Sequence, residues 1–131
     1  MVRRGYDRIG ARYFQWRRTI RATASFVNRA LQGLPQDGWA LDLGCGPGLP
    51  VTEALARRGR VVGVDLSATQ LSMAHRNAPS ARLIQADVTE VAFQPGSFDL
   101  VVAFYCLNHV PRELLGGLLG RIESWLKQGG S

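Results

Sequence analysis

The stretch LDLGCGPGLP, residues 41–50, constrains most strongly what this chain can fold into. A short apolar run leads into three glycines at alternate positions, Gly44, Gly46 and Gly48, and Pro50 then suits the first turn of a helix. Glycine is used where the backbone turns tightly or where a ligand comes too close for a side chain. The pattern therefore predicts a strand, a ligand-binding loop and a helix in succession.

The order of strand, turn and helix repeats along the rest of the chain. Ser67 and Gln70 have the spacing of a helix-capping box, which predicts a helix start there. The predicted strands cover residues 39–43, 60–66, 81–87 and 98–107, and the predicted helices cover 51–59, 67–79 and 111–126. Strands that alternate with helices are joined by right-handed crossovers into a parallel sheet. We therefore predict an α/β fold with a doubly wound parallel sheet.

An amphipathic helix is predicted ahead of these repeats. Apolar residues recur at steps of three and four from Ile9 through Ala24 to Leu31, and residues 1–30 hold eight arginines and one acidic residue. We interpret the arginines as the solvated face of this helix. A basic arm that binds nucleic acid or an anionic membrane is the alternative. We expect one domain over 1–131, with the basic helix at 1–34 and the core at 39–131.

Composition and cysteine usage narrow the class of protein. The chain has 131 residues with a net charge of +6, and no apolar run is long enough to span a bilayer. Its two cysteines, Cys45 and Cys106, do not have the spacing of a zinc site or a disulfide framework. We expect a cytoplasmic protein that holds no metal and does not bind a membrane.

A carboxylate at the end of the second strand indicates the ligand class. Parallel sheets of this kind bind ligands at the carboxyl ends of their strands. Asp65 lies there, 21 positions after Gly44, and its carboxylate can accept both hydroxyls of a ribose. Asp42, just before the glycine loop, repels phosphate and attracts a cation. The G-x-G-x-G spacing also places Leu49 where a dinucleotide site has its third glycine. These features favour a cofactor with ribose, adenine and a positive end.

Four motifs in order give this chain a family resemblance. They are ALDLGCGPG, VVGVDLS, LIQADVTEVAFQPGSFDLVVAFYCLNHVP and WLKQGG. With them the chain resembles class I S-adenosylmethionine-dependent methyltransferases, above all the small-molecule group that includes the ubiquinone and menaquinone biosynthesis enzymes. The resemblance implies a Rossmann-like sheet of strand order 3-2-1-4. It also implies transfer of a methyl group from S-adenosyl-L-methionine to a carbon, oxygen or nitrogen acceptor, with S-adenosyl-L-homocysteine as the product.

The resemblance also assigns cofactor contacts, residue by residue. Asp42 would support the ammonium end, Asp65 would bind the ribose hydroxyls and Asp87 would accept from the adenine amino group. Tyr6 and Tyr13 would face the sulfonium from a lid formed by the N-terminal helix, or would only pack that helix. The complete set is Tyr6, Tyr13, Asp42, Gly44, Cys45, Gly46, Gly48, Asp65, Leu66, Asp87, Val88 and Phe104. The alternative for Asp65 and Asp87 is a solvated strand end.

One histidine is the catalytic candidate. His109 lies in CLNHVP, directly after the fourth predicted strand and at the mouth of the expected site. A histidine there can act as a general base on the acceptor. It can also fix the loop through a hydrogen bond, and we favour this structural role.

The chain differs from the family pattern at its C-terminal end. In the family a KPGG turn leads into further strands, whereas the resemblance here ends at KQGGS and leaves the fourth strand as an edge. A long apolar edge invites pairing with another chain. We therefore weigh a homodimer or a partner chain, and a non-catalytic cofactor-binding module, against the enzyme. A minor alternative is an RNA methyltransferase, which would use Arg17, Arg18 and Arg21.

Overall fold

A parallel sheet with helices on both of its faces makes up the described part of the chain. The computed structural model describes residues 20–103 and 110–131. Within them the strands are β1 (Trp39–Leu43), β2 (Arg60–Asp65), β3 (Arg82–Gln85) and β4 (Leu100–Val102). The helices are α2 (Ile20–Gly33), α3 (Val51–Arg58), α4 (Ala68–Asn77) and α5 (Arg112–Trp125). The strands pair in parallel in the order β3-β2-β1-β4, which confirms the predicted α/β fold and strand order.

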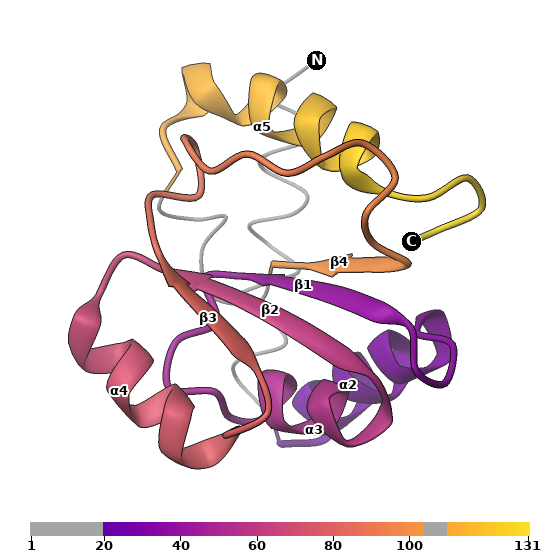
Figure 1. Ribbon diagram of the computed structural model, residues 1–131, viewed down its shortest axis with the longest axis vertical. Helices are drawn as coiled ribbons and strands as arrows, with labels where there is room; N and C mark the ends of the chain where they lie inside the picture. Colours follow the sequence, from indigo (N-terminus) through magenta and orange to yellow (C-terminus); the bar gives the residue numbers. More distant parts are fainter. Residues whose placement is uncertain (1–19, 104–109) are drawn as a thin grey trace.

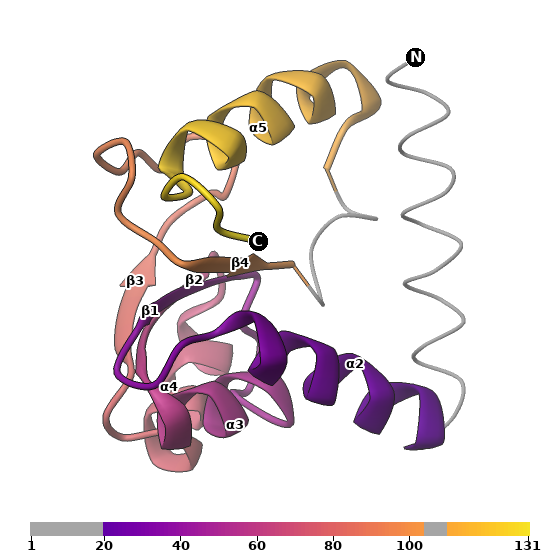
Figure 2. The ribbon, with the colours of Figure 1, turned by 90° about the vertical axis from the view of Figure 1, so that its right-hand side faces the viewer.

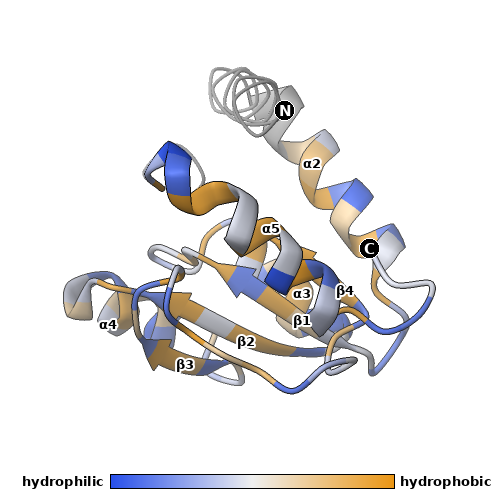
Figure 3. Cartoon of the chain, turned by 90° about the horizontal axis from the view of Figure 1, so that it is seen from above, coloured by the Kyte–Doolittle hydropathy of each residue, from blue (hydrophilic) through white to orange (hydrophobic). Residues whose placement is uncertain are grey.

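The helices divide unequally between the two faces of the sheet. Helices α2, α3 and α4 cover one face, and α5 covers the other (Figures 1 and 2). On the first face Leu34, Val51 and Leu55 are buried against Ala40 and Leu100. On the second face a cluster of buried side chains packs around α5, namely Leu41, Leu43, Val62, Val64, Phe98, Val110, Leu115, Leu118 and Trp125. Burial on both faces explains why the central strands β1 and β2 are rich in apolar residues (Figure 3).

Helix α2 is the described part of the predicted basic helix. Its side chains Phe26, Val27 and Leu31 pack against the core that α3 shares with the sheet. The prediction was wrong for Ala24, which is exposed. Among the described side chains of α2, Ala30 and not Ala24 is the alanine that is buried in this core. Residues 1–19, including the predicted lid, lie outside the described residues, and so the lid stays a prediction.

Strand β4 is shorter than predicted, and its outer side has a neighbour. The prediction covered 98–107, whereas β4 spans Leu100–Val102 and residues 104–109 lie outside the described residues. Residues 126–131 run beside it: Lys127 N–H donates to the Phe98 carbonyl at 2.8 Å, and Val101 N–H donates to the Ser131 carbonyl at 2.8 Å. The end of the chain, marked C, lies beside β4 in Figure 1. The expected open edge is therefore partly paired by the chain's own C-terminal residues.

Candidate functional site

The glycine loop lies between β1 and α3, at the carboxyl ends of the strands. Gly44, Gly46 and Gly48 have φ angles of 69°, 58° and 85°, a region that side chains with a Cβ rarely adopt. The backbone N–H groups of Gly44 and Cys45 donate to the Val64 carbonyl at 2.7 and 3.0 Å. The loop is thereby fixed to the end of β2, where Asp65 follows.

The third glycine of the loop has a packing role. A Cβ on Gly48 would lie 2.9 Å from the Cα of Ala74 in helix α4. The Asn77 side chain, also on α4, donates to the Pro47 carbonyl at 2.8 Å. Helix α4 therefore rests directly on the loop, and glycine at position 48 permits this close approach.

Backbone donors hold the Asp65 carboxylate in place. Oδ2 accepts from Gly46 N–H at 3.0 Å, and Oδ1 accepts from Ser67 N–H at 2.9 Å. The Ser67 hydroxyl oxygen in turn accepts from Gln70 N–H at 3.2 Å, which confirms the predicted cap of α4. The same carboxylate thus joins the glycine loop to the start of α4. Each oxygen keeps a lone pair for a further donor.

Asp87 lies at the start of a tight turn after β3. Its Oδ1 accepts from Thr89 N–H at 2.9 Å and from the Thr89 hydroxyl at 2.7 Å. The Thr89 hydroxyl bond is the main cause that lowers the pKa of Asp87, followed by the Thr89 backbone bond and the positive charge of Arg121. Asp87 is therefore an ionised hydrogen-bond acceptor at neutral pH.

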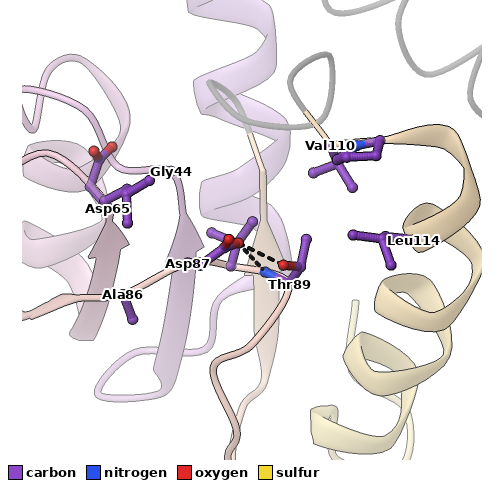
Figure 4. Close-up of a pocket in the computed structure, with 10 residues that line it drawn as sticks. Gly44, Asp65, Ala86, Asp87, Thr89, Val110 and Leu114 are labelled. Atoms are coloured by element: carbon purple, nitrogen blue, oxygen red, sulfur yellow. Dashed lines mark hydrogen bonds between the residues drawn. The ribbon is translucent and has the colours of Figure 1, made fainter.

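A cavity of about 310 Å³ opens between these strand ends and the start of α5 (Figure 4). Five of the predicted cofactor contacts line it, namely Gly44, Asp65, Leu66, Asp87 and Val88. Leu66 and Leu114 are 67% and 47% exposed, although both are large and apolar. The cavity therefore combines two carboxylates with apolar walls, which suits a ligand that has hydroxyl or amino donors on a flat apolar body.

A buried carboxyl lies beneath the loop. Asp42 in β1 is 1% exposed, and its Oδ2 accepts from the Thr52 hydroxyl of α3 at 2.7 Å. Its Oδ1 has no hydrogen-bond partner within the described residues. Burial raises the pKa of Asp42 to about 7, the Thr52 bond opposes the rise, and the charge of Asp65 adds to it. A buried carboxyl without a cation is costly, so this site is suited to a positive group nearby.

Cys45 packs within the loop. The thiol is buried, and its sulfur would lie 3.1 Å from a Cβ added to Gly63. Burial raises the pKa of Cys45 to about 12, with contributions from the charges of Asp42 and Asp65. The thiol is therefore protonated at neutral pH and fills space. No three histidine, cysteine or acidic side chains form a metal site within 20–103 and 110–131.

Some predicted residues lie elsewhere. Asp42, Cys45, Gly46 and Gly48 are in or under the loop and do not line the cavity. Tyr6, Tyr13, Phe104 and His109 lie outside the described residues. The prediction missed five lining residues, namely Ala86, Thr89, Val110, Pro111 and Leu114. A signal existed only for Thr89, because a threonine two positions after an aspartate is typical of a side-chain-stabilised turn.

No described helix is both long enough and apolar enough to cross a membrane.

Comparisons with known proteins agree on one family. Residues 40–130 match the methyltransferase domain family. A 2-phytyl-1,4-naphtoquinone methyltransferase of Thermosynechococcus vestitus is 40% identical over 84 residues, which are 59% of this chain and 37% of that protein. A trans-aconitate 2-methyltransferase of Paracidovorax citrulli is 42% identical over 97 residues, which are 69% of this chain and 35% of that protein. The chain thus spans little more than a third of these curated relatives.

A solved structure matches the fold closely. It is the geranyl diphosphate C-methyltransferase of Streptomyces coelicolor A3(2), in complex with Mg²⁺, geranyl diphosphate and S-adenosyl-L-homocysteine. The superposition has a TM-score of 0.69 at 27% identity and covers 86% of this chain and 43% of that one.

Proposed function

Since the chain belongs to the methyltransferase domain family, we propose that it binds S-adenosyl-L-methionine and transfers its methyl group to a small-molecule acceptor. The main structural support is a single cavity that joins the glycine loop to two strand-end carboxylates, Asp65 and Asp87. The solved relative that contains S-adenosyl-L-homocysteine supports the same cofactor.

The lining residues fit the nucleoside part of this cofactor. Asp65 would accept the two ribose hydroxyls, because its carboxylate is oriented by Gly46 and Ser67 and retains free lone pairs. Asp87 would accept from the adenine amino group. The apolar side chains of Leu66, Val88 and Leu114 would contact the adenine ring. Covering the exposed Leu66 and Leu114 in this way would remove apolar surface from water.

Asp42 fits the charged part of the cofactor. Its Oδ1 lacks a partner among the described residues, and its pKa is raised to about 7. A positive ammonium or sulfonium nearby would favour the carboxylate form. The alternating glycines leave room for the amino-acid end of the cofactor to approach the loop backbone. Thr52 would hold the carboxyl in one orientation.

Methyl transfer from this cofactor needs no general acid, because the leaving group is neutral. The bound cofactor supplies an electrophilic methyl group on a positively charged sulfur, and the sulfur leaves as a neutral thioether. This chain would then act mainly by holding the acceptor in line with the methyl carbon, which is worth ~7–11 kcal/mol in well-oriented reactions. His109 remains the candidate base for a hydroxyl acceptor, although we favour a structural role in the loop for it. Tyr6, Tyr13 and Phe104 remain proposed cofactor contacts.

The acceptor class is proposed from the relatives. A naphthoquinone methyltransferase and a trans-aconitate methyltransferase are both named for small organic acceptors. We therefore expect a small molecule with a nucleophilic carbon, oxygen or nitrogen rather than RNA. The arginines on which the RNA alternative depends, Arg17, Arg18 and Arg21, lie where no side chain is described.

Thermal unfolding with added ligands tests the proposal on the full chain. A ligand that binds only the folded state stabilises it by RT ln(1 + [L]/Kd), which is ~2.7 kcal/mol at a hundredfold excess over Kd. S-adenosyl-L-methionine and S-adenosyl-L-homocysteine should raise the melting temperature, and NADH should not. Formation of S-adenosyl-L-homocysteine with hydroquinone and carboxylate acceptors, followed by mass spectrometry, then tests transfer. A folded chain that neither cofactor stabilises would contradict the proposal.

A further inference from the structure

Thr89 lines the cavity, but the proposed function assigns no role to it. Its backbone N–H and its hydroxyl donate to Oδ1 of Asp87. Both hydrogen bonds from Thr89 to the Asp87 carboxylate thus go to the same oxygen. In Figure 4, Asp87 and Thr89 lie between Asp65 and the α5 side of the cavity, represented by Val110 and Leu114. Thr89 thus occupies one oxygen and leaves the other for a ligand.

The turn that holds Thr89 is anchored from across the fold. The Arg121 guanidinium of α5 donates to the Thr89 carbonyl and also lies over the Trp125 ring at 5.8 Å. The N–H groups of Glu90 and Val91 donate to the Asp87 carbonyl at 2.9 and 3.0 Å. Because these contacts fix the backbone that follows the Asp87 side chain, the carboxylate has little freedom to turn its occupied oxygen toward a ligand.

We propose that Thr89 is a specificity-determining residue that makes Asp87 select a purine with an exocyclic amino group over one with an oxo group. This inference rests on the proposed function, because it takes Asp87 to face the 6-position of the cofactor's base. An ionised carboxylate only accepts hydrogen bonds. It therefore pairs with the amino group of adenine and repels the carbonyl oxygen of hypoxanthine. Thr89 acts through Asp87 and is a positioning residue.

The charged groups around Asp87 determine how this selection depends on pH. Arg121 faces it from α5 and favours its ionised form, as the Thr89 hydroxyl does. Asp65 lines the same cavity from the end of β2, and Glu90 lies in the same turn and is exposed. When Asp87 is protonated, its new O–H can donate to an oxo group. The preference for the amino purine should therefore disappear as the pH falls through the pKa of Asp87.

Binding of S-adenosyl-L-homocysteine and of its deaminated analogue S-inosyl-L-homocysteine tests this inference on the full chain. The wild type should prefer the adenine compound by ~10-fold or more, the effect of a hydrogen bond to a charged group. Thr89→Val keeps the backbone hydrogen bond to Asp87 and removes the one from the hydroxyl. Its preference for the adenine compound should therefore be severalfold smaller, and as the pH falls this preference should disappear at a higher pH than in the wild type. Thr89→Ser should restore the wild-type preference and the wild-type pH midpoint. Thr69→Val is the matched control, because it makes the same change at an exposed position of α4, and it should leave the preference unchanged.

Arg121→Gln is the second variant, because it disturbs the same turn without changing Thr89. It should reduce the preference in the same direction and move its pH midpoint upward. If the adenine compound binds and both variants keep the wild-type preference and pH midpoint, the role of Thr89 is wrong and the proposed function stands. If the folded wild type binds neither compound, both the proposed function and this inference fail.

Discussion

The Thr52 hydroxyl donates to Oδ2 of Asp42 at 2.7 Å, beneath the glycine loop and away from water. Thr52 belongs to the first turn of α3 and Asp42 to β1, so this bond joins the two elements that flank the loop. The other carboxyl oxygen has no partner within the described residues. The loop therefore rests on a carboxyl that is only half satisfied, and this makes both stability and ligand binding sensitive to pH.

Stability should fall with rising pH because of Asp42. Its pKa is raised from 3.8 to about 7 in the folded chain, so between these values the folded state binds more protons than the unfolded state. The free energy of unfolding then decreases as the pH rises through this window, and the decrease is complete above about pH 7. Asp42→Asn removes the titrating group. Urea unfolding between pH 4 and pH 8 should show the wild type losing stability relative to Asp42→Asn.

Asp37→Asn is the control for that comparison. Asp37 is exposed and has a φ of 60°, a conformation that asparagine also tolerates. The difference in unfolding free energy between Asp37→Asn and the wild type should stay constant over the pH range in which Asp42 titrates. A wild type and an Asp42→Asn variant whose stabilities change in parallel with pH would show that Asp42 titrates normally.

Cofactor affinity should rise with pH through the same range. A positive cofactor group near Asp42 favours the carboxylate, so binding below about pH 7 must release a proton. The dissociation constant of S-adenosyl-L-homocysteine should increase by up to ~10-fold for each pH unit below this value. Asp42→Asn should bind more weakly at pH 8 and lose most of the pH dependence. Titrations at pH 6, 7 and 8 provide the test, and a wild-type affinity that is flat over this range would contradict it.

Gly48→Ala should destabilise the fold as well as the loop. The residue has a φ of 85°, and the new Cβ would lie 2.9 Å from the Cα of Ala74. The left-handed conformation alone costs roughly 1–2 kcal/mol for a residue with a Cβ. The contact adds to this cost, because backbone atoms of α4 cannot move aside freely. Urea unfolding should show a loss above ~1 kcal/mol, whereas a variant as stable as the wild type would mean that α4 does not rest on the loop.

Replacing either of two glycines in α5 by alanine should stabilise the fold. A Cβ on Gly117 or Gly120 meets nothing within 4 Å, and both residues are exposed on the helix. Alanine in an exposed helix interior is better than glycine by ~1 kcal/mol. Gly117→Ala and Gly120→Ala should each raise the free energy of unfolding by about this amount, without altering cofactor affinity. Equal or lower stability would indicate that α5 is not helical at these positions in solution.

Local sequence patterns predicted most of the fold, because they are set by neighbours along the chain. The apolar runs, the Ser67–Gln70 cap and the glycine loop each specify an element within a few residues. Their alternation then predicted a parallel sheet, and the strand order came from the family resemblance. The pairing of Ser131 with Val101 and Asp99 was not predicted, since it joins segments about 30 positions apart and depends on how α5 returns the chain.

The site was predicted in part for the same reason. Asp65 was predicted from its place at a strand end, because a parallel sheet places such ends at one edge, and Asp87 was predicted from the family resemblance. The Arg121 contact with the Thr89 carbonyl joins residues 32 positions apart, so no local sequence pattern predicts it. Leu114 lines the cavity only because α5 crosses the second face of the sheet. The third glycine was expected to face the ligand, and in the structure its lack of a side chain also lets α4 approach.

Calorimetric titration of S-adenosyl-L-homocysteine into the wild type, Asp65→Asn and Asp37→Asn tests whether the cavity is a cofactor site. We expect the wild type and Asp37→Asn to bind with equal affinity and NADH to give no heat. Asp65→Asn should bind more weakly by ~10-fold or more, as expected for hydrogen bonds to a charged group. Equal affinity of the folded Asp65→Asn variant and the wild type would contradict the ribose assignment. Absence of binding to the folded wild type would contradict the claim that this cavity is a cofactor site.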